Sequence, residues 1–286
     1  MRWMVTGAGG MLGTDLVERL RAQDAQVIAL PRSALDIRDR EAVLRALREL
    51  RPSVVINCAA WTAVDDAETQ EDAALRVNGH AVAFLAEGCA EVGARLVQPS
   101  TDYVFDGSAH EPYAEDAATA PLGAYGRTKL AGELAVLETL PSTGYVVRTA
   151  WMYGRAGASF VRTMIRLEAE RETVNVVDDQ HGQPTWTRDL AASLVDLVRA
   201  DAPAGIYHGT SSGRTTWYGL AREVFTLLGA DPGRVRPVTS AEFPRPAPRP
   251  AFGVLGHKRW EAAGLSPIRH WRDALRAAWP EMAGSA

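Results

Sequence analysis

Short apolar runs alternate with longer amphipathic segments through the first half of the chain. Five runs have the length and composition of buried strands, at residues 2–5, 26–30, 54–57, 95–98 and 145–148. Between them, apolar residues recur at helical spacing, as in the set Met11, Leu12, Leu16, Val17 and Leu20. Strands that alternate with helices indicate βαβ units and a parallel sheet covered on both faces. The predicted fold class is therefore α/β, with a doubly wound Rossmann sheet.

The second half of the chain is less regular and carries a proline-rich segment. Strand patterns occur at residues 174–177 and 205–208, and helical patterns at residues 187–199, 216–228, 258–264 and 270–279. The segment 243–250 reads Phe-Pro-Arg-Pro-Ala-Pro-Arg-Pro, and prolines at alternate positions force an extended path. We expect this half to form a smaller lobe over the carboxyl edge of the sheet.

Length and composition fit this two-part organisation. The chain has 286 residues, of which 47% are hydrophobic and 23% are charged, as in an ordinary globular protein. We therefore predict a cofactor-binding Rossmann domain of residues 1–150, to which residues 185–202 return. Residues 151–184 and 203–286 are predicted to form the C-terminal substrate-binding lobe. The sequence does not fix the oligomeric state and allows a homodimer.

Charge and hydropathy narrow the classes of partner. The formal net charge is −4 and the positive charges are scattered, which disfavours nucleic acid. No apolar stretch approaches the roughly 18–20 residues of a membrane span. A strand pattern at residue 2 leaves no room for a signal peptide, so we expect a cytoplasmic protein. Cys58 and Cys89 lie in apolar runs, as buried free thiols do, and the six histidines show no metal-ligand spacing.

A glycine cluster follows the first strand and opens the first helix. Gly7, Gly10 and Gly13 stand three apart, with Met11 and Leu12 between the last two. Glycine permits a positive φ and close approach to a pyrophosphate, and the helix N-terminus offers free N–H groups to the phosphates. The strict G-x-G-x-x-G spacing fails, because Leu12 takes its last position. A plain tight turn is the alternative, but the placement between strand and helix favours a dinucleotide site.

The end of the second strand predicts which dinucleotide is preferred. An acidic residue there binds the ribose of NAD(H), but this chain has Arg32 and Ser33, and no acid before Asp36. A guanidinium suits the 2′-phosphate of NADP(H), so we predict NADP(H) as the preferred cofactor, with NAD(H) as the alternative. Asp36 and Ile37 are placed to reach the adenine. A solvated surface position is the other interpretation of Arg32.

Small residues at the end of the third strand extend this predicted site. Cys58, Ala59 and Ala60 follow Asn57 directly. Side chains of this size leave room for a cofactor to lie across the edge of the sheet. Tight packing at a strand end explains the same residues equally well, so this stretch supports a cofactor site only in combination with the glycine cluster.

Tyr125 and Lys129 are the candidates for proton transfer. Their spacing of four places both on one face of a helix, roughly 5–6 Å apart at Cβ. A free phenol has a pKa of about 10, and a nearby ammonium lowers that pKa. The lysine can also hydrogen-bond a ribose. Ser100 and Thr101 follow the fourth strand, where a hydroxyl can orient a carbonyl group, so the set indicates carbonyl reduction.

These motifs resemble the dTDP-4-dehydrorhamnose reductase family of the extended short-chain dehydrogenase/reductase superfamily. The resemblance runs from the first strand to Trp271. It is carried by residues 57–65 with Glu68 following, residues 100–107 (Ser-Thr-Asp-Tyr-Val-Phe-Asp-Gly), residues 125–129, residues 148–151 and residues 179–185. The chain departs from the family at Phe252-Gly253, where an aromatic residue or asparagine followed by serine is common.

The resemblance implies a reaction and a set of roles. The enzyme would reduce the C4 ketone of dTDP-4-dehydrorhamnose, or of another dTDP-4-keto-6-deoxyhexose, by hydride transfer from NADPH. Thr101 would hydrogen-bond the ketone, and Tyr125 would donate the proton beside Lys129. The implied substrate contacts are Tyr103, Trp151, Gln183, Thr185 and Arg249. Core packing is the alternative for Trp151, and a surface ion pair is the alternative for Arg249.

Other functions stay open at this level. A 4,6-dehydratase of the superfamily needs an Asp-Glu pair after the threonine, and Asp102-Tyr103 lacks that carboxylate base. An epimerase is harder to exclude. The family also resembles the non-catalytic, NADP-binding regulatory subunit of methionine adenosyltransferase. The complete set of Thr101, Tyr125 and Lys129 favours an enzyme.

Overall fold

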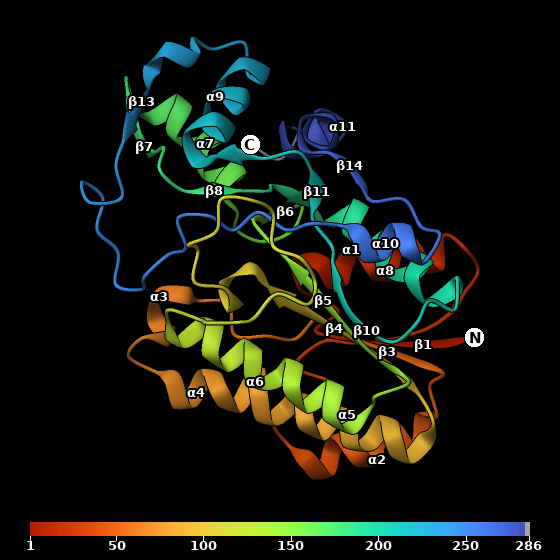
Figure 1. Ribbon diagram of the computed structural model, residues 1–286. Helices are drawn as coiled ribbons and strands as arrows, with labels where there is room; N and C mark the ends of the chain where they lie inside the picture. The colour runs from red at the N-terminus through yellow and green to blue at the C-terminus, as the bar shows by residue number, and fades with distance from the viewer. Residues whose placement is uncertain (284–286) are drawn as a thin grey trace.

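A six-stranded parallel sheet organises the computed structural model, which describes residues 1–283 (Figure 1). The strand order is β10–β5–β4–β3–β1–β2, and it reverses between β1 and β3 as in a doubly wound fold. The strands are β1 (Arg2–Thr6), β2 (Gln26–Leu30), β3 (Val54–Asn57), β4 (Arg95–Thr101), β5 (Gly144–Thr149) and β10 (Gly205–His208). The predicted fold class is confirmed. Residues 284–286 of the predicted lobe lie outside the described residues.

Helices cover both faces of this sheet (Figure 1). One face carries α1 (Met11–Arg21) and α8 (Thr187–Arg199), and the other carries α2 (Arg40–Leu50), α5 (Ala81–Val92) and α6 (Ala124–Thr139). The short helices α3 (Val64–Ala67) and α4 (Glu71–Leu75) come before a π-helical turn, η1 (Arg76–His80), that leads into α5. Such a turn widens the helix locally and is frequent beside functional sites.

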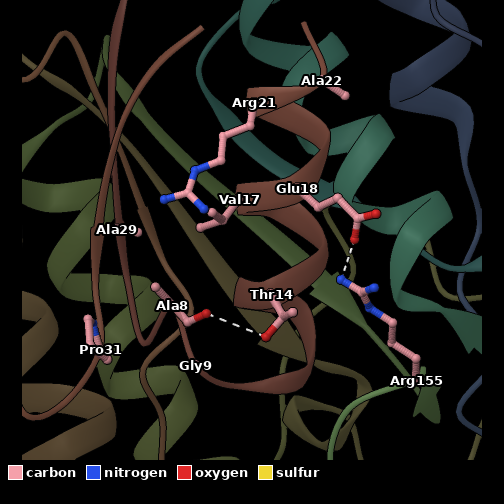
Figure 2. A pocket seen from close by; sticks show the side chains of 10 residues that line it. All are labelled: Ala8, Gly9, Thr14, Val17, Glu18, Arg21, Ala22, Ala29, Pro31 and Arg155. Atoms are coloured by element: carbon pink, nitrogen blue, oxygen red, sulfur yellow. Dashed lines mark hydrogen bonds and ion pairs between the residues drawn. The ribbon is translucent and has the colours of Figure 1, made fainter. Parts of the chain in front are cut away.

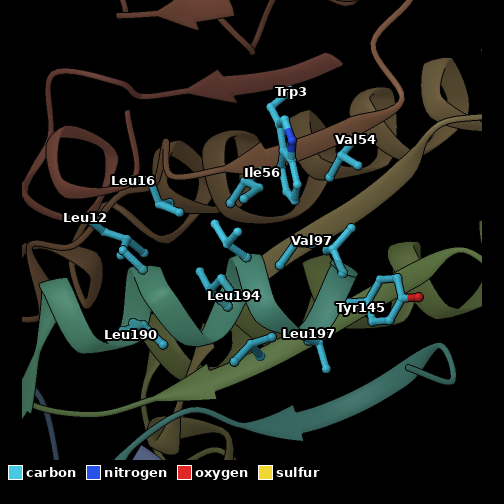
Figure 3. Packing of buried hydrophobic residues seen from close by; sticks show 14 of the residues in the cluster. Trp3, Leu12, Leu16, Val54, Ile56, Val97, Tyr145, Leu190, Leu194 and Leu197 are labelled. Carbon is cyan, nitrogen blue, oxygen red and sulfur yellow. The ribbon is translucent and has the colours of Figure 1, made fainter. Parts of the chain in front are cut away.

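Successive residues of the strands point to opposite faces of the sheet and pack into two separate cores. Trp3 and Val5 of β1 pack with Leu16 of α1 and Leu194 of α8, as Figure 3 shows for the larger cluster. Met4 points to the opposite face and joins the core under α2 and α5. Because α8 packs on the sheet, the chain that follows it enters as the sixth strand, β10. The predicted boundary had left that strand in the smaller lobe.

The smaller lobe lies at the carboxyl edge of the sheet, because β5 and β10 both lead directly into it (Figure 1). Its helices are α7 (Phe160–Glu170), α9 (Trp217–Leu227) and α11 (Trp271–Ala283), and the 3₁₀ turn η3 (Pro232–Arg234) lies between α9 and β13. The short helix α10 (Lys258–Ala262) packs on the core of the main sheet through Trp260, and the 3₁₀ turn η2 (Asp102–Val104) follows β4. The strand pairs of the lobe are β6 (Met152–Tyr153) with β9 (Thr185–Trp186), β7 (Val174–Val177) with β13 (Val235–Val238), β8 (His181–Gly182) with β12 (Thr215–Thr216), and β11 (Ser211–Ser212) with β14 (Ile268–His270). Trp271, Leu275 and Phe225 anchor a core of its own.

The proline-rich segment, residues 243–250, connects the two parts of the molecule. We call it the proline strap. It leaves the lobe after β13 and reaches α3, where Arg245 and Arg249 both bind Asp65. The chain then returns to the lobe, and the backbone of Ala251 accepts a hydrogen bond from His181 N. The extended path predicted from the prolines is thus an inter-lobe connection.

Candidate active site

The glycine cluster forms a tight loop between β1 and α1. Gly7 has a φ of +61°, and a Cβ there would lie 2.5 Å from the backbone N of Ala59. A Cβ on Gly13 would lie 2.3 Å from the carbonyl oxygen of Gly7. α1 begins at Met11 after Gly10, which has no side chain to cap it, so the first helical N–H groups are free to bind an anion. The loop fits a pyrophosphate.

A cavity of about 430 Å³ lies beside this loop, and we call it the first cavity. Its lining includes the predicted cofactor residues Gly7, Gly10, Arg32, Asp36, Ile37, Cys58, Ala59 and Ala60. Three other predicted residues, Met11, Leu12 and Gly13, lie in the first turn of α1, directly after the loop. Ser33 is exposed and is not part of the lining. The structure therefore gathers most of the predicted cofactor set around one space.

Three arginines line the first cavity. Arg38 donates to Asp36 through Nε at 2.9 Å and Nη2 at 2.5 Å, and these bonds lower the pKa of Asp36 to about 2. Arg32 and Arg76 make no ion pair with any other residue in 1–283. The sequence interpretation missed Arg38 and Arg76. Arg38 follows Asp36 closely and was open to the same argument as Arg32, whereas Arg76 is the first residue of the π-helical turn, which no sequence motif indicated.

Tyr125 and Lys129 share a face of α6, as predicted. Lys129 is buried, and its Nζ donates to the carbonyl oxygen of Pro99 at 2.7 Å. Burial lowers the pKa of Lys129 to about 8. Burial raises the pKa of Tyr125, the charge of Asp102 adds to the rise, and a hydrogen bond with Thr101 opposes it. The expected lowering of the Tyr125 pKa by Lys129 is wrong for this arrangement, because burial dominates and the ammonium is directed to Pro99.

Thr101 ends β4 and completes this group. Its hydroxyl donates to Asp102 Oδ1 at 3.1 Å and accepts from the Tyr103 N–H at 3.1 Å. A hydrogen bond also joins it to Tyr125. The rings of Tyr103 and Tyr125 meet edge to face, with centroids 5.6 Å apart. The three predicted catalytic side chains therefore lie together at the carboxyl end of a central strand, where sites form in open α/β sheets.

A second cavity, of about 320 Å³, lies in the smaller lobe. Apolar side chains of α7 and β7 and the ring of Trp217 form its wall, and the proline strap adds Phe243, Arg245 and Arg249. Trp151 stacks on Trp217, with centroids 3.5 Å apart and planes 10° apart, and so supports this wall. An apolar wall beside two arginines suits an aromatic ring linked to an anion. Helix α7 was not predicted from the sequence, although apolar residues recur at helical spacing there after the N-cap Ser159, so this cavity was not predicted as a whole.

Asp65 holds both strap arginines. Its Oδ1 accepts from Arg249 Nη1 at 3.0 Å, and its Oδ2 accepts from Arg245 Nη2 at 2.5 Å. Oδ1 also accepts from the backbone N of Ala247 at 3.2 Å. Burial alone would raise the pKa of Asp65, but the hydrogen bonds from Arg249 and Arg245 lower it to about 2. Arg249 thus has the ion pair considered as its alternative role and also lines the second cavity.

Gln183 and Thr185 are buried beneath the site. Gln183 Oε1 accepts from Leu255 N at 2.8 Å and from Thr210 Oγ1 at 2.9 Å, while its Nε2 donates to Leu255 O. Thr185 Oγ1 donates to the carbonyl oxygen of Gln183. These bonds tie the segment after the proline strap to the lobe. That either side chain contacts a substrate stays a prediction.

A hollow larger than the first cavity lies on the other side of the phosphate loop, between α1 and β2 (Figure 2). It measures about 630 Å³ and shares Gly9 and Pro31 with the first cavity. On one wall Arg155 pairs with Glu18, and on another Thr14 Oγ1 lies 3.5 Å from the carbonyl oxygen of Ala8. None of the predicted catalytic residues lines it, so its size does not mark it as the reaction site.

Both cysteines are free thiols. Cys89 is buried as expected, while Cys58 is half-buried at the first cavity, and burial raises its pKa to about 12. Among residues 1–283, no helix combines the length and the hydropathy needed to cross a membrane. The same part of the chain gathers no group of three side chains suited to hold a metal ion.

Known proteins resemble this chain along its whole length. The family model described as "RmlD substrate binding domain" matches residues 1–283. The chain is 58% identical to a dTDP-4-dehydrorhamnose reductase of Streptomyces griseus, covering 100% of this chain and 95% of the relative. It is 57% identical to a dTDP-4-keto-6-deoxy-D-glucose reductase of Streptomyces niveus, covering 98% and 96%. A crystal structure of dTDP-4-dehydrorhamnose reductase from Bacillus anthracis in complex with NADP has a TM-score of 0.94 at 36% identity, covering 98% and 99%.

Proposed function

The chain belongs to the dTDP-4-dehydrorhamnose reductase family, and we propose that it reduces the C4 ketone of a dTDP-4-keto-6-deoxyhexose with NADPH. One observation carries the proposal: Thr101, Tyr125 and Lys129 lie together at the carboxyl end of β4. Their chemistry is that of carbonyl reduction, which needs a proton donor, a group that orients the ketone and a cation beside the donor.

The position of these residues relative to the two cavities supports the same proposal. Lys129 interacts electrostatically with Cys58, which lines the first cavity. Tyr103 touches the ring of Tyr125 and interacts with Arg249, which lines the second cavity. A cofactor in the first cavity and a substrate in the second would therefore meet beside Tyr125.

Each side chain has a distinct task in the proposed reaction. NADPH supplies the hydride when it is bound. Tyr125 donates its phenolic proton to the ketone oxygen, and its raised pKa keeps the phenol protonated until then. Thr101 donates a hydrogen bond to the same oxygen. Lys129 holds the cofactor ribose and so positions the nicotinamide beside Tyr125.

The proposed cofactor contacts follow the first cavity. The loop from Gly7 to Gly13, with the N–H groups of Met11 and Leu12, binds the pyrophosphate. Arg32, with Ser33, binds the 2′-phosphate, and this contact favours NADPH over NADH. The adenine lies by Asp36 and Ile37, and the residues 58–60 leave room for the cofactor to cross the sheet edge. The NADP complex of the Bacillus anthracis relative supports this choice.

The proposed substrate contacts follow the second cavity and its surroundings. Arg249 binds the diphosphate, and Tyr103 and Trp151 lie along the sugar, with Gln183 and Thr185 beneath it. We propose residues 1–150 and 185–202, together with the sheet strand β10 that follows them, as the cofactor domain, and the remainder as the substrate lobe. dTDP-4-dehydrorhamnose is the proposed sugar. A different 4-keto-6-deoxyhexose is the second candidate, because a relative of nearly equal identity is named for dTDP-4-keto-6-deoxy-D-glucose.

The test is NADPH oxidation with each of these two ketosugars, followed by identification of the product. Turnover of dTDP-4-dehydrorhamnose to dTDP-rhamnose supports the first assignment, and turnover of the other sugar alone supports the second candidate. If NADPH binds but neither sugar is reduced, the proposal fails and the non-catalytic subunit becomes the better interpretation. A pull-down with a methionine adenosyltransferase then tests that interpretation.

A further inference from the structure

The carboxyl group of Asp102 lies in a place that gives an ionised carboxylate little support. It is 3% exposed, in the 3₁₀ turn that follows β4. Its one side-chain hydrogen-bond partner within residues 1–283 is the Thr101 hydroxyl, and the backbone N–H groups of Asp102 and Tyr103 oppose the effect of burial on its pKa without overcoming it. Gly253 faces it closely, since a Cβ on that residue would lie 2.5 Å from Asp102 Oδ2. At this position, where the sequence departs from its family, no side chain is present to donate a hydrogen bond.

The charges on the elements packed around Asp102 are engaged elsewhere. In the described part of the chain, no cation lies within ion-pair distance of it. The cations of α6, β5 and the proline strap bind other groups. Lys129 donates to the carbonyl oxygen of Pro99, and Arg148 pairs with the carboxylate of Glu133. Arg249 pairs with the carboxylate of Asp65. Tyr103 and Tyr125 are the titratable groups that face it, and both are neutral. Burial accordingly raises the pKa of Asp102 to about 7.

The Thr101 hydroxyl cannot serve two acceptors at once. It has one hydrogen and two lone pairs, and the Tyr103 N–H occupies one lone pair. An ionised Asp102 has no proton to give, so the Thr101 hydrogen must point at the carboxylate. A protonated Asp102 donates instead to the second lone pair of Thr101. Only in that state is the Thr101 hydrogen free to point to the Tyr125 oxygen and, when a substrate is bound beside Tyr125, to the ketone oxygen.

We propose that Asp102 is a positioning residue that must carry a proton before Thr101 can donate its hydrogen to the substrate ketone. The inference rests on the proposed function, which gives Thr101 this role. The Asp102 proton is not consumed, because it stays on the carboxyl group and only orients its neighbour. Ionisation of Asp102 turns the Thr101 hydrogen away from the ketone, and the reductase loses that contact while its fold is unchanged.

The test is the pH dependence of kcat/KM for the wild-type protein and for Asp102→Asn. The amide of asparagine cannot ionise and can donate permanently to Thr101, so it imitates the protonated acid. From about pH 5.5 to about pH 9, wild-type kcat/KM should fall by about tenfold per pH unit above neutrality. Asp102→Asn should keep the rate seen at low pH and show no fall near pH 7. Any later fall then belongs to Lys129, whose pKa is about 8.

A control separates this role from a merely structural one. Thr101→Val removes the hydroxyl and should lower turnover by about 10²–10³-fold, as loss of a donor to a developing oxyanion does. The remaining rate should no longer change near pH 7, and adding Asp102→Asn to this variant should change nothing further. If Asp102→Asn does not fold, Asp102→Ala gives the same test of the pH profile, since alanine also leaves Thr101 without an anionic neighbour.

Three results would overturn the inference. They are a wild-type profile that is flat through pH 7, an Asp102→Asn profile that keeps the wild-type fall, and a Thr101→Val profile that keeps it. Failure of the proposed function looks different, because no ketosugar is then reduced at any pH. The protonation itself can still be measured in that case, as the carboxylic C=O infrared band in the wild-type minus Asp102→Asn difference spectrum. Absence of that band at about pH 6 also overturns the inference.

Discussion

Asp65 and Arg249 are 184 residues apart in the sequence and form an ion pair of 3.0 Å across the two lobes. The pair fixes a strap arginine at the rim of the second cavity, and Arg245 shares the same carboxylate. If these arginines bind the substrate diphosphate, Asp65 determines their positions before the substrate binds. Under the proposed function, the pair would connect a residue of the first half of the chain to substrate affinity.

We expect Asp65→Ala to raise the KM for the sugar nucleotide by about tenfold, which corresponds to about 1.4 kcal/mol. Both arginines lose the partner that orders them, while Tyr125 and Lys129 are untouched, so kcat should change little. Steady-state kinetics with saturating NADPH measures KM and kcat separately. A lower KM would contradict this prediction and would mean that Asp65 competes with the diphosphate for the arginines.

We expect Tyr125→Phe to lower kcat by about 10²–10⁴-fold, the usual contribution of a general acid. The phenyl ring keeps the packing against Tyr103, so NADPH should bind as before. Tyr113→Phe is the matched control, because its hydroxyl bonds Asp106 on a different loop. A Tyr125→Phe rate near that of the control would remove Tyr125 from the mechanism.

We expect Lys129→Met to lower both turnover and NADPH affinity. The ammonium is buried at the carboxyl end of β4, beside the first cavity, and methionine fills a similar volume without its charge. Single-turnover kinetics and a fluorescence titration with NADPH measure the two effects separately. Full retention of NADPH affinity would show that Lys129 does not hold the ribose.

We expect Arg32→Ala to raise the KM for NADPH by about tenfold and to leave the KM for NADH nearly unchanged, because only NADPH carries the 2′-phosphate. Arg21→Ala is the control, since Arg21 lines the hollow on the other side of the phosphate loop. Equal losses with both cofactors would instead assign Arg32 to a part that they share, or to folding.

We expect Asp102→Asn to be more stable than the wild type above pH 7 and equally stable near pH 4. The folded-state pKa of Asp102 is about 7 and its ordinary value is 3.8. Between these values the folded chain holds a proton that the unfolded chain has lost, so wild-type stability falls as pH rises through this window. The difference should reach the order of 4 kcal/mol, measured by chemical denaturation across the pH range. A constant difference at all pH values would show that Asp102 does not titrate there.

Local sequence patterns predicted the doubly wound sheet and the helix that carries Tyr125 and Lys129. These patterns depend on spacings of two to four residues, which strands and helices impose directly. The carboxyl ends of parallel strands meet at one edge, so the glycine loop and Thr101 could be placed together before any coordinates were known. The same reasoning placed Arg32 at this edge, because it follows the end of β2, and Arg32 lines the first cavity.

Features that depend on distant contacts could not be predicted in this way. The pairing of Asp65 with Arg249 and the burial of Asp102 against Gly253 join segments more than 150 residues apart. Trp151 adopts a φ of +45°, which is uncommon for a residue other than glycine, and its ring stacks on Trp217 and packs over Gly182. The phenol pKa was predicted from one neighbour, whereas burial, which no local pattern records, determines its direction.

The first cavity is lined by residues between Gly7 and Val77, and the second by residues between Phe160 and Arg249. The two linings share no stretch of sequence. Mutations that reshape the second cavity can therefore accumulate while the residues around the first stay as they are. A gene with this layout can change the lining of the second cavity by recombination or drift in its second half and keep the lining of the first.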